Sequence, residues 1–100
     1  MDITTNLDGN TGTIAVKGKL TVATSPELED AVRQLGTDVV NFDIDLTELE
    51  YISSAGLRVL VSTQKLAMQR GGSIRLLHPT AEVTEVFEMT GLSEVMTIVS

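Results

Sequence analysis

Apolar and polar side chains alternate along several short stretches of the chain, which is the pattern of a half-buried strand. The clearest stretch runs from residue 39 to residue 46, where apolar residues occupy every second position: Val40, Phe42, Ile44 and Leu46. A period of two places one set of side chains on each face of a sheet. A strand buried on both faces would instead be apolar throughout. We therefore expect helices to cover only one face of the sheet.

Shorter patterns of the same kind predict strands at residues 3–7, 13–17 and 73–77. The turn-forming run Asp8-Gly-Asn-Thr-Gly12 predicts a hairpin between the first two. Gly18 is expected to end the second strand, and residues 20–22 suit a further short one. Residues 95–99 suit either a final short strand or a helical tail.

Three segments have the spacing of amphipathic helices. The first begins at Thr24-Ser-Pro-Glu27, with Thr24 or Ser25 as N-cap and a proline in the first turn. The second extends from about Ser54 to Arg70, and the third follows His78-Pro79-Thr80. Each is ended by glycine, at Gly36, at Gly71 with Gly72, and at Gly91.

After the hairpin, strands and helices alternate, which implies parallel strands joined by helical crossovers. We predict one domain over residues 1–100, of the α/β class, with a mixed four- to five-stranded sheet and helices packed on one face. One hundred residues are enough to bury a core without disulfides or metals. No linker or internal repeat is apparent.

The composition excludes several kinds of site. There is no cysteine and a single histidine, His78, so a metal site and a cysteine nucleophile are not expected. Asp43 and Asp45 are the solvent-side positions of a strand and are interpreted as surface residues. A net charge of −7 disfavours direct binding to nucleic acid. We expect no cofactor.

The chain shows no signal peptide, and no apolar run approaches the ~20 residues of a membrane-spanning helix. We therefore expect a cytoplasmic protein. Its charge is uneven: residues 51–81 hold four basic residues and no acidic one, the basic ones being Arg58, Lys65, Arg70 and Arg75. This segment is either a set of dispersed, solvated side chains or a locally positive face.

Ser53 and Ser54 stand at the start of the second predicted helix, where backbone N–H groups lack partners and the helix dipole is positive. Ser53 could simply cap the helix, which is worth ~1 kcal/mol. The same place also suits a phosphate. Gly56 is unusual there, because glycine costs a helix ~1 kcal/mol relative to alanine. Either a partner approaches the backbone at Gly56, or the helix packs tightly on the sheet.

A hydrolytic serine is not indicated. Ser54 would have only His78 as a base, and Ile-Ser-Ser-Ala-Gly differs from the Gly-x-Ser-x-Gly turn of serine hydrolases. We predict that the protein is not an enzyme.

Residues 51–60, Tyr-Ile-Ser-Ser-Ala-Gly-Leu-Arg-Val-Leu, resemble the signature of STAS domains, in particular that of bacterial anti-sigma factor antagonists, which typically reads Tyr-Ile-Asp-Ser-Ser-Gly-Leu. Further similar segments are Val16-Lys-Gly-Lys-Leu20, Asp45-Leu-Thr47, Gly71-Gly72 and Pro79 with Phe87-Glu-Met-Thr-Gly-Leu92. Together they cover nearly the whole chain in the order and spacing of the family.

The resemblance implies a function. In that family a partner anti-sigma factor kinase phosphorylates the serine that aligns with Ser54, and a phosphatase removes the phosphate. The free antagonist binds the kinase and so releases a sigma factor. Here the preceding aspartate is replaced by Ser53, which adds a competing hydroxyl, and the following serine by Ala55. Thr21 stands where the family often has an aspartate.

We therefore expect an anti-sigma factor antagonist, a monomer whose binding is controlled by phosphorylation of Ser54 or, less favoured, Ser53. The expected partner-binding residues are Thr21, Ser53, Gly56, Arg58, Ser62 and Lys65. The alternative is a constitutive STAS subunit of a lipid-transport permease or stress-signalling complex, in which Ser54 has no switching role. A small nucleotide- or anion-binding domain is a third reading, supported only by the helix N-terminus.

Overall fold

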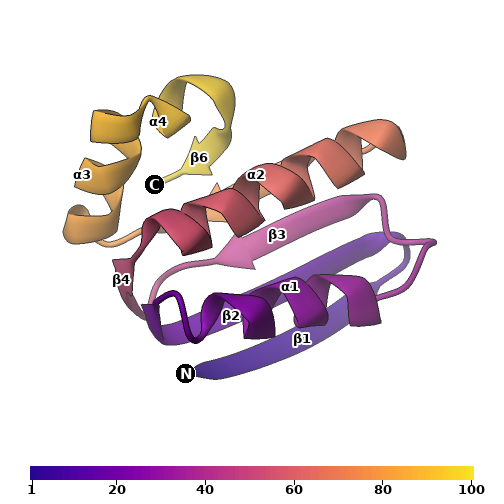
Figure 1. Cartoon of the computed structure of the whole chain (residues 1–100). Coiled ribbons are helices and arrows are strands. Elements are labelled where there is room, and N and C mark those ends of the chain that lie inside the picture. The colour runs from indigo at the N-terminus through magenta and orange to yellow at the C-terminus, as the bar shows by residue number, and fades with distance from the viewer.

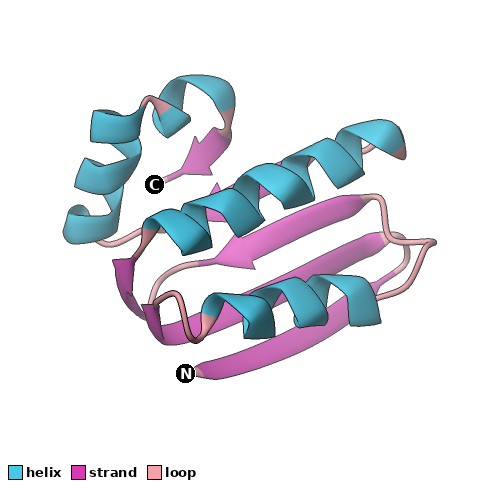
Figure 2. Ribbon diagram, in the orientation of Figure 1, coloured by secondary structure: helices cyan, strands magenta, loops and turns pink.

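The computed structural model describes residues 1–100, which form a layered α/β domain (Figures 1 and 2). Its elements, in chain order, are β1 (Asp2–Asp8), β2 (Thr11–Leu20), α1 (Ser25–Gln34), β3 (Asn41–Asp45), β4 (Leu49–Ile52), α2 (Ser54–Gln69), β5 (Ile74–Leu77), α3 (Ala81–Thr90), α4 (Leu92–Val95) and β6 (Thr97–Val99).

The sheet has the strand order β1-β2-β3-β5-β6, and β4 pairs with β2. β1 is antiparallel to β2, and every other pair is parallel. The predicted mixed sheet is thus confirmed. The predicted number of four to five strands is too low, because the sheet has six.

The strand that was not predicted is β4, which pairs with the end of β2. β2 itself continues past Gly18 instead of ending there. Gly18 has a φ of +107°, and the register shifts between Gly18 and Lys19. A bulge of this kind bends a strand without ending it. The first half of β2 pairs with β3, and its end pairs with β4. The separate strand predicted at residues 20–22 is wrong, since the chain turns after Leu20.

Helices α1 and α2 lie side by side over one face of the sheet (Figure 1). Strand side chains facing them, such as Ile14, Phe42 and Ile44, are fully buried. They form a single core with Leu28 of α1 and Leu60 of α2. One cluster of 21 buried apolar residues accounts for the whole core, as a single domain requires.

The opposite face of the sheet carries polar side chains, as the alternation in residues 39–46 predicted. The Arg75 guanidinium on β5 contacts the Asp43 carboxylate on β3 at 2.7 Å. This pairing raises the pKa of Arg75. The Thr47 hydroxyl donates to the Asp45 carboxylate at 2.6 Å and holds the pKa of Asp45 below its ordinary value. Asp43 and Asp45 are therefore engaged in local polar contacts.

Residues 81–99 lie at one end of the sheet, where α3 contacts β4 and α4 leads into β6 (Figure 1). Thr80 caps α3 by accepting from the Val83 N–H, while His78 lies in the preceding loop with a φ of +52°.

The short helix α4 was not predicted. Of the two alternatives for residues 95–99, the strand is correct. Met89 on α3 is 79% exposed. No helix combines the length and the apolar character needed to span a bilayer.

Candidate functional site

The two serines lie at the junction between β4 and α2. The Ser53 N–H donates to the Leu20 carbonyl at 2.8 Å, so the edge of the sheet holds the chain at this point. Ser53 has an extended backbone with φ −89° and ψ 172°, and α2 begins at the next residue. β4, which the sequence pattern did not reveal, therefore fixes where the helix starts.

The hydroxyls of the two serines have different surroundings. The Ser53 hydroxyl accepts a hydrogen bond from the Gly56 N–H at 3.2 Å and is the N-cap of α2. Ser54 is exposed, and its hydroxyl makes no hydrogen bond to the protein. One hydroxyl is thus used by the fold, whereas the other is free for a partner or a modifying enzyme.

We expect Ser53→Ala to lower the free energy of unfolding by ~1 kcal/mol, because it removes the cap of α2. Ser54→Ala should change it by less than ~0.5 kcal/mol, because an exposed hydroxyl without a partner is lost. Thermal unfolding followed by circular dichroism measures both. Equal losses for the two variants would contradict this assignment of the cap.

Gly56 is buried, and the structure explains the glycine by packing. A Cβ atom at this position would lie 2.8 Å from Ile52 Cγ1 and 3.1 Å from Leu20 Cβ. The helix therefore packs closely on the sheet, which is the second of the two explanations considered for Gly56. Gly56 was predicted to contact the partner, and this prediction is wrong because Gly56 faces the sheet. It sets the distance between α2 and the sheet and is not part of the contact surface.

Arg58, Ser62 and Lys65 are exposed on α2, but they do not share one surface feature. Arg58 and Ser62 line an open groove of about 280 Å³ between α1 and α2, together with Val22, Ser25, Pro26, Glu29, Ala55 and Val59. A second hollow of about 220 Å³ continues it along the two helices and shares Glu29, Val59 and Ser62. Lys65 lines neither. We call these two hollows the α1–α2 groove.

Sequence reasoning missed the contribution of α1 to this groove. Val22 lies at the end of the groove nearest the start of α1 and is 74% exposed. The apolar Val22 fitted the short strand predicted at residues 20–22, so the sequence pattern did not mark it as a surface residue. Its place in the groove depends on the tertiary placement of α1 beside α2.

Thr21 organises the turn that precedes α1. The Thr24 N–H donates to the Thr21 hydroxyl at 3.2 Å, and the Thr21 N–H donates to the Thr24 hydroxyl at 2.8 Å. This reciprocal pairing is a capping arrangement. Thr24 is the N-cap residue of α1, as predicted, but its side chain accepts from Thr21 and not from a helix N–H. Thr21 is half-buried at the edge of the site.

The four basic residues of segment 51–81 do not form a continuous face. Arg70 donates to the carbonyl oxygens of Gly36 and Val39 at 3.2 and 2.7 Å, and Arg75 pairs with Asp43 on the far face of the sheet. Only Arg58 and Lys65 are exposed on α2 without an ion-pair partner. Of the two alternatives, dispersed charge is therefore correct, with Arg58 the cation one turn after Ser54.

Comparison with known proteins identifies relatives over nearly the whole chain. The family model described as "Mlab, STAS domain" matches residues 3–99. An anti-sigma-B factor antagonist of Listeria monocytogenes is 36% identical over 87 residues, which cover 85% of this chain and 75% of the relative. One from Bacillus subtilis is 29% identical over 100 residues, covering 98% of this chain and 92% of the relative.

Solved structures share the fold. A putative anti-sigma factor antagonist of Thermotoga maritima superposes with a TM-score of 0.89 at 19% identity, covering 98% of this chain and 86% of that one. The phosphorylated form of the Bacillus cell fate determinant SpoIIAA gives a TM-score of 0.77 at 17% identity, covering 99% and 92%. The mixed sheet and the helices of the present structure follow this architecture. The chain therefore belongs to the STAS domain family and is related to the bacterial anti-sigma-B factor antagonists.

Proposed function

We propose that this protein is an anti-sigma factor antagonist, a binding module that sequesters an anti-sigma factor kinase and thereby releases a sigma factor. The observation that carries this proposal is the free, exposed hydroxyl of Ser54, directly after Ser53, the N-cap of α2. It stands at the position where the signature of the antagonists has its acceptor serine. The names of the relatives, antagonists at 29–36% identity, support the same function.

The start of α2 suits a phosphate on Ser54. The N–H groups of Ser54 and Ala55 have no acceptor within the helix, whereas those of Gly56 and Leu57 are bonded to Ser53. A phosphate adds about −1.5 to −2 charges at pH 7 and meets the positive end of the helix dipole. Arg58 lies four residues further along the same helix face, at a spacing that allows an ion pair. Phosphorylation is thus compatible with the fold.

The partner surface would be built around Ser54 from both helices. It includes the N-cap Ser53 and, on α2, Arg58 and Ser62, and Lys65 extends it along the exposed face. The turn before α1 adds Thr21, together with Val22, which lines the α1–α2 groove. An exposed valine beside a groove offers a partner apolar area near the switch residue. In this function the protein is a cytoplasmic monomer and a substrate of a kinase and a phosphatase, not itself an enzyme.

A constitutive STAS subunit of a transport or stress-signalling complex would use the same helix face without a switch. The observation that supports this second function is the match to the family model described as "Mlab, STAS domain". The two functions differ in one measurable property, the response of partner binding to a charge at residue 54.

We expect phosphate on Ser54 after incubation with ATP and the kinase recovered on the immobilised protein from a lysate of the native organism. The free hydroxyl is accessible, whereas that of Ser53 is held by the Gly56 N–H. Peptide mass spectrometry locates the phosphate. Ser54→Ala should abolish incorporation, and Ser53→Ala, the matched control, should retain it. Phosphate found on Ser53 alone would show that Ser53, and not Ser54, is the modified residue.

A further inference from the structure

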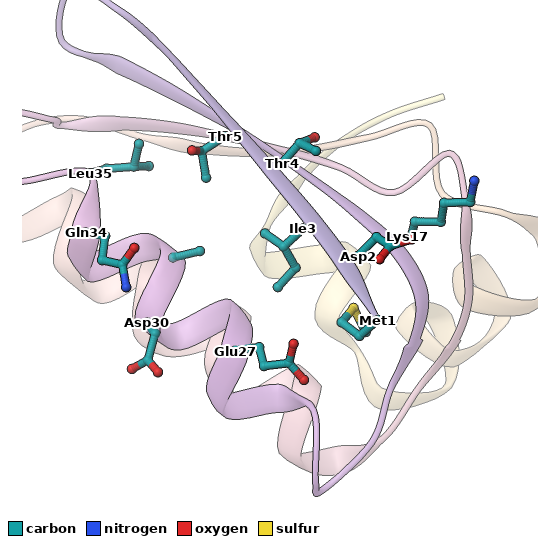
Figure 3. Close-up of a pocket in the computed structure, with 11 residues that line it drawn as sticks. Met1, Asp2, Ile3, Thr4, Thr5, Lys17, Glu27, Asp30, Gln34 and Leu35 are labelled. Atoms are coloured by element: carbon teal, nitrogen blue, oxygen red, sulfur yellow. The ribbon is translucent and has the colours of Figure 1, made fainter.

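The largest cavity of the molecule lies away from Ser54, between strand β1 and helix α1. It is an open cleft of about 860 Å³. In Figure 3 the Ile3 side chain points from β1 toward α1, whereas Thr4 points to the opposite side of the strand. Ile3, Ala31 and Leu35 provide an apolar floor for this cleft. We call it the β1–α1 cleft.

One wall of the β1–α1 cleft is the free edge of the sheet. β1 is the first strand in the sheet order and pairs only with β2, so its outer edge has no neighbour. It is seven residues long, whereas β6 at the other edge has three. The outer edge of a strand presents N–H and C=O groups at alternate residues, which an extended peptide can pair with. The cleft therefore combines a backbone template with an apolar floor.

Three of the four charged side chains around the β1–α1 cleft are acidic. Glu27 and Asp30 lie along its α1 side, and Asp2 lies on β1 (Figure 3). Asp30 contacts Arg33 at 2.6 Å, whereas Glu27 has no ion-pair partner. The cations of the lining are the Lys17 ammonium, which faces Glu48 at 3.8 Å, and the α-amino group of Met1. The charge of the cleft thus favours a cationic ligand.

The same charges disfavour a second copy of this chain. An antiparallel pair of β1 strands in full register would place Asp2 opposite Asp8 of the copy, twice. Like charges directly opposite each other destabilise a strand pair. Two copies would also bring together two chains of net charge −7. A basic strand would turn each of these repulsions into an attraction.

From the free edge, the apolar floor and the acidic lining, we propose that the β1–α1 cleft binds an extended basic segment of a partner protein, which adds to β1 as a further strand. The aliphatic stems of its Lys or Arg side chains cover Ile3 and Leu35, and their charged ends reach Glu27 and Asp30. On the other side of the added strand, cationic side chains face Asp2 and Asp8. This surface is separate from the α1–α2 groove, so both can be occupied together.

The test uses NMR of the ¹⁵N-labelled protein with the capped peptide acetyl-Lys-Lys-Val-Lys-Val-Lys-Lys-amide, which as a strand carries lysine on both faces. We expect a dissociation constant on the order of 0.1–1 mM at low salt, weakening as salt is added. Shift changes should be confined to β1 and to the cleft side of α1, and should leave residues 53–62 unaffected. The same peptide with glutamate for lysine, or with proline at its centre, should not bind.

Matched variants distinguish specific binding in the β1–α1 cleft from general electrostatic attraction to an acidic protein. Reversing both charges in Glu27→Lys/Asp30→Lys should raise the dissociation constant about 10-fold. Glu85→Lys/Glu88→Lys, on the exposed side of α3, changes the net charge equally and should have little effect. Equal weakening by both pairs, shifts spread over the surface, or no binding at several millimolar peptide would overturn the proposal. So would self-association of the protein through β1.

Discussion

Ser54→Asp is expected to weaken binding to the partner kinase by at least ~100-fold while the protein remains folded. In the proposed function the partner surface complements a neutral hydroxyl and offers no counter-charge of its own, so a carboxylate at this point loses its hydration in the interface. An unpaired charge buried in an interface costs ~3–5 kcal/mol, and each 1.4 kcal/mol is a tenfold change in affinity. Isothermal titration calorimetry with the isolated partner measures the loss.

The fold should tolerate the same carboxylate. Residue 54 is exposed and is the first residue of α2. An acidic side chain there interacts favourably with the helix dipole, by ~0.3–1 kcal/mol. The melting temperature of Ser54→Asp should therefore equal or slightly exceed that of the wild type.

Ala81→Asp is the matched control. Ala81 is exposed and is the first residue of α3, directly after the N-cap Thr80, as Ser54 follows Ser53. The substitution adds the same charge at the same position of a different helix, outside the proposed partner surface. It should leave partner binding unchanged.

Ser54→Ala should bind the partner whether or not ATP is present, because it cannot be phosphorylated. Wild-type affinity in Ser54→Asp would reject the switch and favour the constitutive subunit.

Gly72→Ala should be the most destabilising of the glycine-to-alanine changes in this protein. A Cβ atom at residue 72 would lie 1.8 Å from the carbonyl oxygen of Val40 and 2.4 Å from its carbon. These are backbone atoms next to β3, so relief requires a shift of the strand or of the loop after α2. Overpacking costs ~1–3 kcal/mol and sometimes more, and we expect the upper end of that range. The melting temperature should fall by roughly 10–25 °C.

Gly71→Ala is the control for Gly72→Ala. Gly71 has a φ of +78°, and a Cβ atom there would meet no other atom within 4 Å. Its replacement should cost only the strain of a left-handed backbone, ~1 kcal/mol. Thermal and urea unfolding of both variants measure the difference. A loss for Gly72→Ala no larger than that for Gly71→Ala would show that the approach of Val40 is relieved without cost.

These two glycines also show the limit of what a sequence pattern can say. Adjacent glycines after a helix predict its end, and α2 does end there. The pattern does not distinguish a glycine required by a positive φ from one required by a close contact. The distinction depends on Val40, more than thirty residues earlier in the chain. Gly56 is a similar case, because Leu20 and Ile52 decide that it faces the sheet.

The sequence by itself determined the main elements, because they follow from local patterns. Period-two alternation located the central strands and predicted a sheet covered on one face, and the helical stripes with their terminal glycines located α1, α2 and α3. The serine pair was also identified from its position before a helix. Each of these features depends on neighbours within a few residues of one another.

The tertiary structure decided the features that depend on distant pairing. β4 has the burial pattern of a buried residue at each end and two exposed residues between, so it has no alternation to detect. It exists because the bulge at Gly18 turns the end of β2 toward it. That pairing fixes Ser53 against Leu20 and makes it the cap, which leaves the Ser54 hydroxyl free. The α1–α2 groove and the β1–α1 cleft are likewise products of packing, since each is lined by residues from separate elements that meet only in the folded chain.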